Sequence, residues 1–188
     1  MEKRKLKKPF IQKPFDWMPI IELKELGACK HPKRADRQSI GYDLCVPENV
    51  IIPARCRVVV QTNISLKLPA NVEAKIEPRS GFSAKGIEGL GVKHKWVLKW
   101  GWLPWRINES GLLRFDADVI NGKIDPGYKG NIGVIIKNNG GKFSILAGTR
   151  IAQMTFYRVL RPNFAVVEEL SGTDRGGGFG HSGTSSKV

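Results

Sequence analysis

Residues 57–68 read RVVVQTNISLKL, and this stretch decides the fold class. Apolar and polar side chains alternate along it. A period of two is typical of a half-buried β-strand, because successive side chains of a strand point to opposite faces. We therefore expect a strand whose buried face carries Val58, Val60, Thr62, Ile64, Leu66 and Leu68.

The same alternation recurs along the chain, whereas helical periodicity is nearly absent. Strands are expected in 71–76, 114–120 and 131–138, and a longer, largely buried strand over 150–160. Turns rich in Gly, Pro and Asn separate these short segments. The pattern predicts an all-β fold, a jelly-roll-like β-barrel or sandwich.

Length and charge limit the possible classes of protein. The 188 residues fit a single domain, and a hydrophobic fraction of 41% with 26% charged residues allows a real core. The formal net charge of +14 indicates a polyanionic partner, with simple solubility as the alternative. Nucleic acid, nucleotide phosphates and an anionic membrane surface are the candidate polyanions.

Cysteine and histidine usage points to a reducing compartment. Cys29, Cys45 and Cys56 lack CxxC spacing, and the three histidines are scattered along the chain. This argues against a disulfide framework and a zinc site, and it favours an intracellular, cytoplasmic protein. No secretory signal or long apolar segment is present, so we expect neither export nor a membrane partner.

Three segments differ in composition from the β domain expected at 19–170. Residues 1–18 are predicted to form a flexible basic arm, and its KRKLKK run is compatible with a nuclear location. Residues 171–188, rich in Gly and Ser, are predicted to form a flexible tail. Residues 86–114 contain four of the five tryptophans and several cations: Lys93, Lys95, Lys99 and Arg106.

Residues 122–130, GKIDPGYKG, lie between two strand-like runs. Pro presets φ and Gly tolerates positive φ, so Asp-Pro-Gly predicts the turn of a β-hairpin. Asp125 is then either only a turn former or a carboxylate held rigidly enough to act as a base.

Two segments carry the chemistry of phosphate contacts. EPRSGFS (77–83) offers a guanidinium, a hydroxyl and backbone donors, although an RSG tripeptide alone is more often a plain turn. The tail combines Arg175 and Phe179 with glycines, which let backbone N–H groups approach a phosphate. No GxxxxGK[ST] sequence is present, which excludes a P-loop NTPase.

Five motifs occur in order along the chain, and together they resemble those of the trimeric dUTP diphosphatases, the dUTPases. The resemblance runs from about residue 21 to residue 184 and leaves out the basic arm and the Trp-rich stretch. The motifs are IGYDL (40–44), EPRSG (77–81), GKIDPGYKGNIGV (122–134), GTRIAQ (148–153) and DRGGGFGHSG (174–183).

The resemblance implies hydrolysis of dUTP to dUMP and pyrophosphate, which limits uracil in DNA and supplies dUMP. A water would attack the α-phosphorus with Asp125 as its base, a role typically worth ~10²–10⁴-fold in rate. Tyr128 would pack on the deoxyribose and exclude a 2′-hydroxyl. Backbone groups around Val119 to Gly122 would read the uracil edge, because cytosine presents the opposite pattern of donors and acceptors.

The resemblance also implies phosphate contacts, a metal and an assembly. Asp43 matches a carboxylate near metal-bound waters, and Mg²⁺ would ride on the triphosphate rather than in a protein cage. Each active site would lie at a subunit interface of a homotrimer, with the tail of another chain closing over the nucleotide. The matching substrate-binding residues are Arg79, Ser80, Gly81 and Gln153 in the domain, and Arg175, Phe179 and Gly180 in the tail.

The sequence departs from the family pattern in two places. Motif five is one residue shorter between Arg175 and Phe179. Gly81 and Asp125 are 44 positions apart, which places an insertion at 86–114. We expect this insertion either to form an extra hairpin that packs on the trimer, or to bind single-stranded nucleic acid or a protein partner.

Two alternative functions follow from the same pocket. A deoxycytidine triphosphate deaminase would need a glutamate ten residues after Asp125, where this chain has Ile135, so that reaction lacks its base. A regulatory or binding protein would keep the pocket and act through residues 86–114 and the basic arm. The presence of Asp125 and Tyr128 argues against an inactive pocket.

Overall fold

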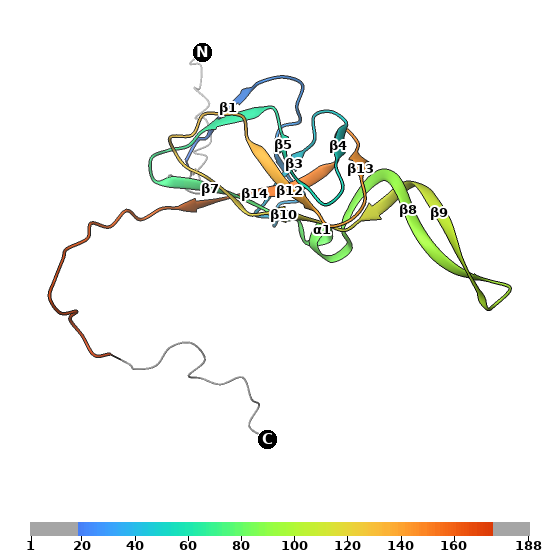
Figure 1. The fold of residues 1–188 in the computed structure, drawn as a ribbon. Coiled ribbons are helices and arrows are strands. Elements are labelled where there is room, and N and C mark those ends of the chain that lie inside the picture. The colour runs from blue at the N-terminus through green and yellow to red at the C-terminus, as the bar shows by residue number, and fades with distance from the viewer. Residues whose placement is uncertain (1–18, 175–188) are drawn as a thin grey trace, which may run out of the picture.

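Antiparallel β-strands make up nearly all of the structure. It is a computed structural model that describes residues 19–174, and within them it contains fourteen strands and one short helix (Figure 1). The strands form four small sheets around one core. The all-β, jelly-roll-like fold expected from the sequence is confirmed.

The largest sheet has five strands and carries most of the candidate site. Because β14 lies between β7 and β3, the last strand of the described residues joins two strands from the first half of the chain. Gln153 of β14 therefore lies opposite both Glu77 and Asp43. The order is β11 (Gly122–Ile124), β7 (Val72–Glu77), β14 (Arg150–Arg158), β3 (Tyr42–Cys45) and β2 (Lys33–Arg34).

Three smaller sheets complete the domain. The first contains β10 (Ala117–Ile120), β12 (Gly133–Asn138) and β5 (Arg57–Gln61). The second pairs β1 (Glu22–Glu25) with β6 (Ile64–Lys67). The third contains β4 (Val50–Ile52), β13 (Phe143–Ile145), β8 (Ile87–Lys99) and β9 (Leu103–Phe115).

Apolar side chains from all four sheets meet in the core, where Phe115 and Phe143 stack with ring centroids 4.4 Å apart. Two glycines of β8 make room for this pair. A Cβ on Gly89 would lie 2.6 Å from Phe143 Cδ2, and one on Gly91 would lie 2.6 Å from Phe115 Cζ. The aromatic pair therefore fixes the first residues of β8 against the domain.

The stretch 57–68 bends and is not one continuous strand, so that expectation is wrong. Asn63 adopts a φ of 58°, in the left-handed region, and it separates β5 from β6, which belong to different sheets. The Leu26 N–H donates to the Asn63 carbonyl at 2.8 Å and holds the bend. The alternate side chains from Val60 to Leu68 are nevertheless buried, as the pattern predicts.

The segment around GKIDPGYKG is more than the tip of a hairpin. β10 and β12 pair as its two arms, as expected. Between them, however, β11 crosses over and pairs with β7 in the five-stranded sheet. Asp125 follows β11 directly, so its position depends on two sheets and not on one hairpin.

A short helix, α1 (Ser80–Lys85), lies where we expected only the end of a strand. Its side chain Phe82 is buried in the core. Gly86 ends the helix with a φ of 72° and donates its N–H to the Phe82 carbonyl at 2.8 Å. A Cβ at this position would clash with the Phe115 carbonyl, so the site requires glycine.

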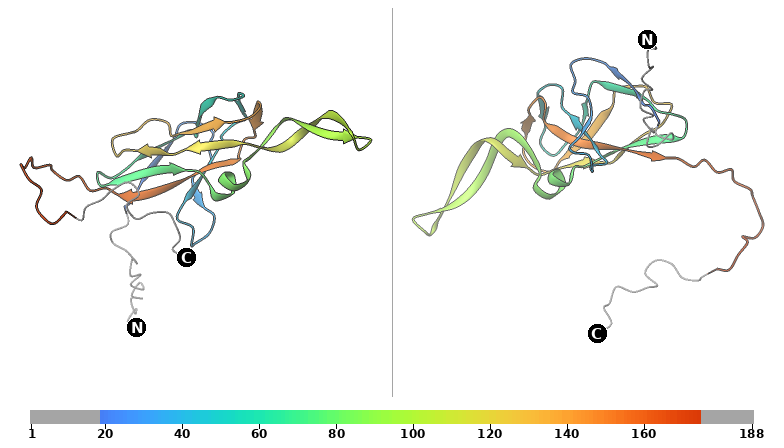
Figure 2. Two further views of the ribbon diagram at one scale, coloured as in Figure 1. Left: turned by 60° about the horizontal axis from the view of Figure 1, so that its bottom comes forward. Right: turned by 180° about the vertical axis from the view of Figure 1, so that it is seen from behind.

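β8 and β9 form one long hairpin that extends away from the domain (Figures 1 and 2). Its register runs from Ile87 opposite Phe115 to Lys99 opposite Leu103, and Trp100 and Gly101 form the turn with positive φ. Residues 86–114 thus contain the extra hairpin that was expected, whereas its packing on a trimer stays a prediction.

Beyond Arg158 the described chain contains no further helix or strand. Residues 159–174 run away from the domain (Figure 1). The basic arm at 1–18 and the tail from residue 175 onward lie outside the described residues. Four apolar side chains of this segment are at least nine-tenths exposed: Leu160, Phe164, Val166 and Leu170.

No helix within residues 19–174 is long and apolar enough to cross a membrane.

Gly89→Ala should destabilise the fold, because its Cβ would overlap the Phe143 ring and lie 2.8 Å from the Ser144 carbonyl oxygen. Overpacking of this kind typically costs about 1–3 kcal/mol. The measurement is thermal unfolding followed by circular dichroism, where a lower Tm is expected. Gly141→Ala is the control, since a Cβ there meets nothing within 4 Å. Equal Tm values for the two variants would contradict this packing.

Candidate active site

Asp43 and two arginines form an ion-paired cluster at one end of the five-stranded sheet. Arg79 donates from Nε to Asp43 Oδ1 at 2.7 Å, and Arg150 donates from Nη1 to Oδ2 at 3.2 Å. The strand order explains the meeting, since β14 lies between β3 and β7. The Asp43 side chain is only 12% exposed, so its carboxylate holds both guanidinium groups in place. One carboxylate faces two cations, and the cluster stays net positive.

A cavity of about 420 Å³ opens beside this cluster. The Arg114 guanidinium donates to Glu88 at 2.7 Å, which partly balances the charge of the wall. An excess of positive charge suits a ligand with several negative charges, such as a triphosphate. The charged residues that line the cavity are Arg79, Lys85, Arg114, Arg150 and Glu88.

Three of these basic residues were not among the predicted site residues: Lys85, Arg114 and Arg150. Arg150 lies inside the motif GTRIAQ, so the sequence did contain a signal for it. Lys85 and Arg114 face the cavity because α1 and the end of β9 pack beside it, an arrangement that only the fold reveals.

Arg79, Ser80 and Gly81 lie together at the start of α1, as expected for one contact segment. Ser80 is exposed beside the cavity. A Cβ on Gly81 would meet nothing within 4 Å, so packing inside this chain does not require glycine there. A requirement for glycine at position 81 would come from another molecule that approaches the backbone.

Gln153 braces this segment from β14. Its Nε2 donates to the Pro78 carbonyl at 3.2 Å, immediately before Arg79. Its other amide atom lies against Gly41, where a Cβ would be 2.5 Å from Oε1. The Gly41 position thus leaves the space that the Gln153 side chain occupies.

Asp125 and Tyr128 are joined by a turn, which confirms the turn prediction. The Tyr128 N–H donates to the Asp125 carbonyl at 3.0 Å, and the Tyr128 hydroxyl donates to the Asn131 carbonyl at 2.7 Å. The Tyr128 ring is 47% exposed. Within residues 19–174 the Asp125 carboxylate forms no hydrogen bond or ion pair, and Asp125 is exposed to solvent.

Val119 and Gly122 lie on the outermost strands of two sheets. β10 pairs only with β12, and β11 pairs only with β7, within the described chain. The outer edges of both strands therefore present backbone N–H and C=O groups without a strand partner there. Such groups can recognise the hydrogen-bonding edge of a flat ligand.

Asp125 and Arg79 lie at opposite ends of β7. Ile124 pairs with Ala74, so Asp125 comes level with Glu73. Arg79 follows the other end of the strand, six residues further along, which is about 20 Å at 3.3 Å per residue. The structure thus groups the predicted site residues into two separate clusters within one chain. One contains Asp43, Arg79, Ser80, Gly81 and Gln153, and the other contains Val119, Gly122, Asp125 and Tyr128.

Asp43 does not fit the role of a direct metal ligand. Both of its oxygens accept bonds from guanidinium groups, and its side chain is largely buried. Mg²⁺ needs several oxygen ligands in octahedral geometry and retains water readily. These residues therefore fit an Mg²⁺ that arrives on a nucleotide and is reached from Asp43 through water.

A second group of side chains could bind a metal, although no cluster of metal ligands was expected from the sequence. Potential ligand atoms of Glu25, Cys29 and His31 all lie within 4.8 Å of one another. His31 Nε2 contacts Glu25 Oε1 directly. Burial and then the nearby Glu25 charge raise the pKa of the Cys29 thiol, which favours its protonated form over a metal-binding thiolate.

An apolar cavity of about 540 Å³ lies over β3 and β14, lined by Tyr42, Met154 and Phe156 among others. No predicted site residue lines it, and it has no cluster of basic groups. Of these two cavities, the smaller basic one is therefore the better candidate for an anionic ligand. Arg175, Phe179 and Gly180 lie outside the described residues.

The family model described as dUTPase matches residues 28–98 and 108–183. The unmatched residues 99–107 form the outer end of the β8–β9 hairpin. This gap is narrower than the insertion expected at 86–114.

Two viral proteins are similar over nearly the whole chain. The deoxyuridine 5′-triphosphate nucleotidohydrolase of Variola virus is 35% identical over 167 residues, which cover 88% of this chain and 93% of that protein. The protein of the same name from Vaccinia virus (strain Copenhagen) is 34% identical with the same coverage.

Solved phage structures share the fold. A Staphylococcus bacteriophage 80alpha dUTPase with dUPNHPP superposes with a TM-score of 0.69 at 23% identity, covering 89% of this chain and 100% of that chain. A dUTPase from phage phi11 of S. aureus, described with a structural Mg(II) ion, has a TM-score of 0.62 at 21% identity, with coverages of 80% and 98%.

The stability of the Asp125 cluster should depend on pH through Lys123 and Glu73, which hold β11 on β7. Lys123 Nζ lies 2.7 Å from Glu73 Oε2. The hydrogen bond to Lys123 is the main cause that lowers the pKa of Glu73, and the same bond raises the pKa of Lys123. The stabilisation is lost as pH falls through the lowered pKa of Glu73, and as pH rises through the raised pKa of Lys123.

Lys123→Gln should therefore lower Tm most near neutral pH, and the deficit should shrink toward both extremes. The measurement is Tm as a function of pH for wild type and variant. Lys137→Gln removes a charge that takes part in no ion pair within residues 19–174 and serves as the control. A deficit that does not vary with pH would show that the pair contributes nothing.

Proposed function

This chain belongs to the dUTPase family, and from that premise we propose that it hydrolyses dUTP to dUMP and pyrophosphate as a dUTP diphosphatase. The reaction limits the uracil available to DNA synthesis and supplies dUMP. The match of the family model over most of the chain and the similarity to poxvirus nucleotidohydrolases support this function. The single structural observation that carries it is the exposed Asp125 on a turn fixed by two sheets.

Asp125 acts as the general base in this proposal. Its carboxylate takes a proton from a water, the water oxygen bonds to the α-phosphorus, and the bond from that phosphorus to the leaving pyrophosphate breaks. A base of this kind must lie within about 2.6–3.2 Å of the water oxygen. The hydrogen bond from the Tyr128 N–H to the Asp125 backbone carbonyl fixes the turn that carries this carboxylate.

The Tyr128 ring and the backbone edges next to it select the nucleoside. The half-exposed ring packs on the deoxyribose and leaves no space for a 2′-hydroxyl. The edges of β10 and β11, around Val119 and Gly122, present the donors and acceptors that uracil complements. Ile135 of β12 stands where a deaminase would need a glutamate, and β12 contains no carboxylate. Deamination of dCTP is therefore excluded from the proposal.

The basic cavity binds the triphosphate. Arg79, Ser80 and Gly81 contact it with side-chain and backbone donors, and Gln153 braces the segment that carries them. Arg150 adds a second guanidinium, which Asp43 holds in position. Asp43 would hold Mg²⁺ through water, and the ion would supply positive charge that offsets part of the charge of the triphosphate.

The active sites are shared between subunits of a homotrimer. Asp125 and Arg79 of one chain are about 20 Å apart, too far for a shared water and phosphate, so two copies together supply the two clusters. The exposed apolar side chains at 160–170 need a cover that the isolated chain lacks. Residues beyond 174 then reach another subunit, with Arg175, Phe179 and Gly180 closing over the nucleotide.

The three free thiols are compatible with a reducing compartment, and we place the enzyme inside the cell. The KRKLKK run allows a nuclear fraction.

Asp125→Asn should retain nucleotide binding and reduce turnover of dUTP by about 10²–10⁴-fold, because the amide keeps the shape but cannot take a proton. Pyrophosphate release measures turnover, and titration with the non-hydrolysable analogue dUPNHPP measures binding. Glu48→Gln, a change at an exposed residue outside the five motifs, is the control. Near wild-type turnover by Asp125→Asn would sink the base assignment.

Mixing two inactive variants should restore activity if the site is shared. Arg79→Ala and Asp125→Asn chains are refolded together, so that a hybrid site can take Arg79 from one chain and Asp125 from the other. Random mixing leaves about one quarter of the sites complete, which sets the expected activity relative to wild type. Each variant refolded alone is the control. No recovery in verified mixed trimers would place both residues of a site on one chain.

A further inference from the structure

The outer part of the β8–β9 hairpin has a composition found nowhere else in the described chain. Residues 93–106, which we call the distal hairpin, contain four tryptophans, three lysines and one arginine, and no Asp or Glu. The family model leaves most of its outer end unmatched. The distal hairpin also lies beyond the basic cavity, whose hairpin wall consists of Ile87, Glu88 and Arg114. The active site proposed above therefore does not account for it.

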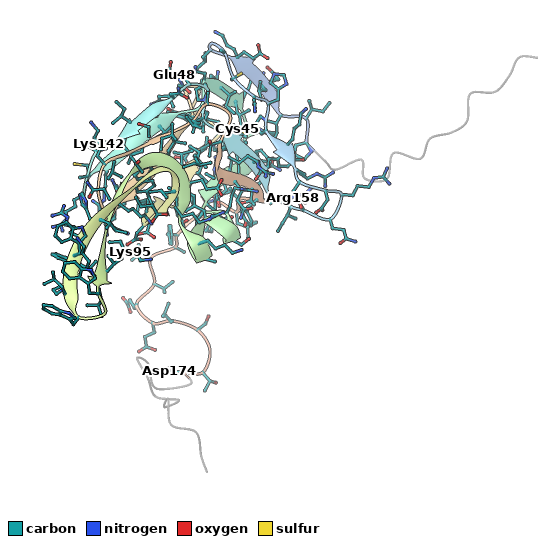
Figure 3. All side chains as sticks on the ribbon, turned by 90° about the vertical axis from the view of Figure 1, so that its right-hand side faces the viewer. Cys45, Glu48, Lys95, Lys142, Arg158 and Asp174 are labelled. Atoms are coloured by element: carbon teal, nitrogen blue, oxygen red, sulfur yellow. The ribbon has the colours of Figure 1, made fainter. Side chains whose placement is uncertain are left out.

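The four indoles are exposed to solvent. Between 50% and 73% of the surface of each is accessible. Figure 3 shows the side chains of the hairpin that carries Lys95. An isolated two-stranded ribbon does not gain from such exposure, because packing of large apolar side chains is what normally stabilises it. Exposed aromatic groups in one place indicate a binding surface. The residues are Trp96, Trp100, Trp102 and Trp105.

The cations of the distal hairpin are not neutralised by acids. None of the four takes part in an ion pair within residues 19–174. Lys99 Nζ lies 4.9 Å from the Trp100 ring centroid and 4.6 Å from that of Trp105. This cation–π arrangement holds a positive charge directly beside two flat aromatic faces. The partner that fits must combine negative charge with aromatic groups.

We propose that the distal hairpin binds single-stranded nucleic acid. Unpaired bases stack on exposed indoles, and the phosphates between them meet the lysines and Arg106. Stacking accepts any base, because every base has a π-face, so the binding is not sequence-specific. Duplex DNA fits less well, since its bases are already stacked on one another.

The register of the hairpin excludes two other partners. Lys93, Lys95 and Lys99 share one face with Trp105, and Arg106 shares the other face with Trp96. A membrane-surface ribbon needs one apolar face and one charged face, whereas here both faces carry indoles and cations. Docking on the distal hairpin of a second copy would bring like charges together without any acid to offset them.

The test measures binding of full-length protein to a fluorescein-labelled 20-residue oligothymidylate by anisotropy, over a range of salt concentrations. A 20-base-pair duplex, phosphatidylserine-containing vesicles and inorganic polyphosphate are the competitors. We expect single strands to compete best. Equal or tighter binding of the duplex, the vesicles or polyphosphate would overturn the proposal, because stacking on unpaired bases would then not be what the surface recognises.

Two variants with matched controls separate the hairpin from the rest of this basic protein. Lys93→Gln, Lys95→Gln and Lys99→Gln together should reduce the salt slope by about 2, since each neutralised phosphate contributes about 0.7. Lys24→Gln, Lys137→Gln and Lys142→Gln make the same charge change on exposed strand and turn positions elsewhere and should leave the slope nearly unchanged. Equal effects of the two triple variants would show that the overall charge of the protein, and not the distal hairpin, determines the binding.

Trp102→Ala tests stacking at a turn position, where the strand pairing is not disturbed. The expected loss of affinity for oligothymidylate is about tenfold, the usual scale for one stacked base. Leu112→Ala removes an exposed apolar side chain nearer the hairpin base and should have no effect. Circular dichroism and dUTP turnover must match wild type in both variants. Unchanged affinity in Trp102→Ala with the fold intact would contradict stacking.

Discussion

The length of β7 is the constraint on which the rest of the molecule depends. β11 pairs along one side of it and β14 along the other, so both clusters of candidate site residues take their positions from this one strand. The basic cluster forms where β7 leads into α1, and Asp125 comes level with its beginning. A rigid strand cannot shorten, so it keeps the two clusters apart within one chain. This separation is the reason for proposing that a neighbouring chain completes each site.

Alternating apolar residues predicted the strands well, because a period of two follows directly from how side chains leave an extended backbone. The alternating pattern did not predict a bend in the chain where the alternation continues through the bend. At Asn63 the backbone bends into another sheet while the side chains on either side keep facing the core. α1 was missed for a related reason, since six residues are too few for a helical period to show. Lys85 followed by Gly86 was its only signal, at the end of the helix.

The ordered motifs named the candidate site residues, but they did not show how these residues meet. Asp43 and Arg150 are 107 positions apart, and only the insertion of β14 beside β3 brings them together. Arg114 reaches the cavity through the base of a hairpin that motif spacing treats as an interruption. Contacts of this kind depend on sheet order, which composition and periodicity do not encode.

The central place of β14 also sets the order in which the molecule can be made. The β8–β9 hairpin joins residues that are neighbours along the chain, so it can form soon after it is synthesised. β7 and β3 can pair with β14 only after residues 150–158 have been synthesised, more than 70 residues after β7. Until that strand has formed, β7 and β3 have unpaired edges, and the ion-paired cluster of Asp43, Arg79 and Arg150 cannot form. In a growing chain the hairpin can therefore form before the candidate active site is assembled.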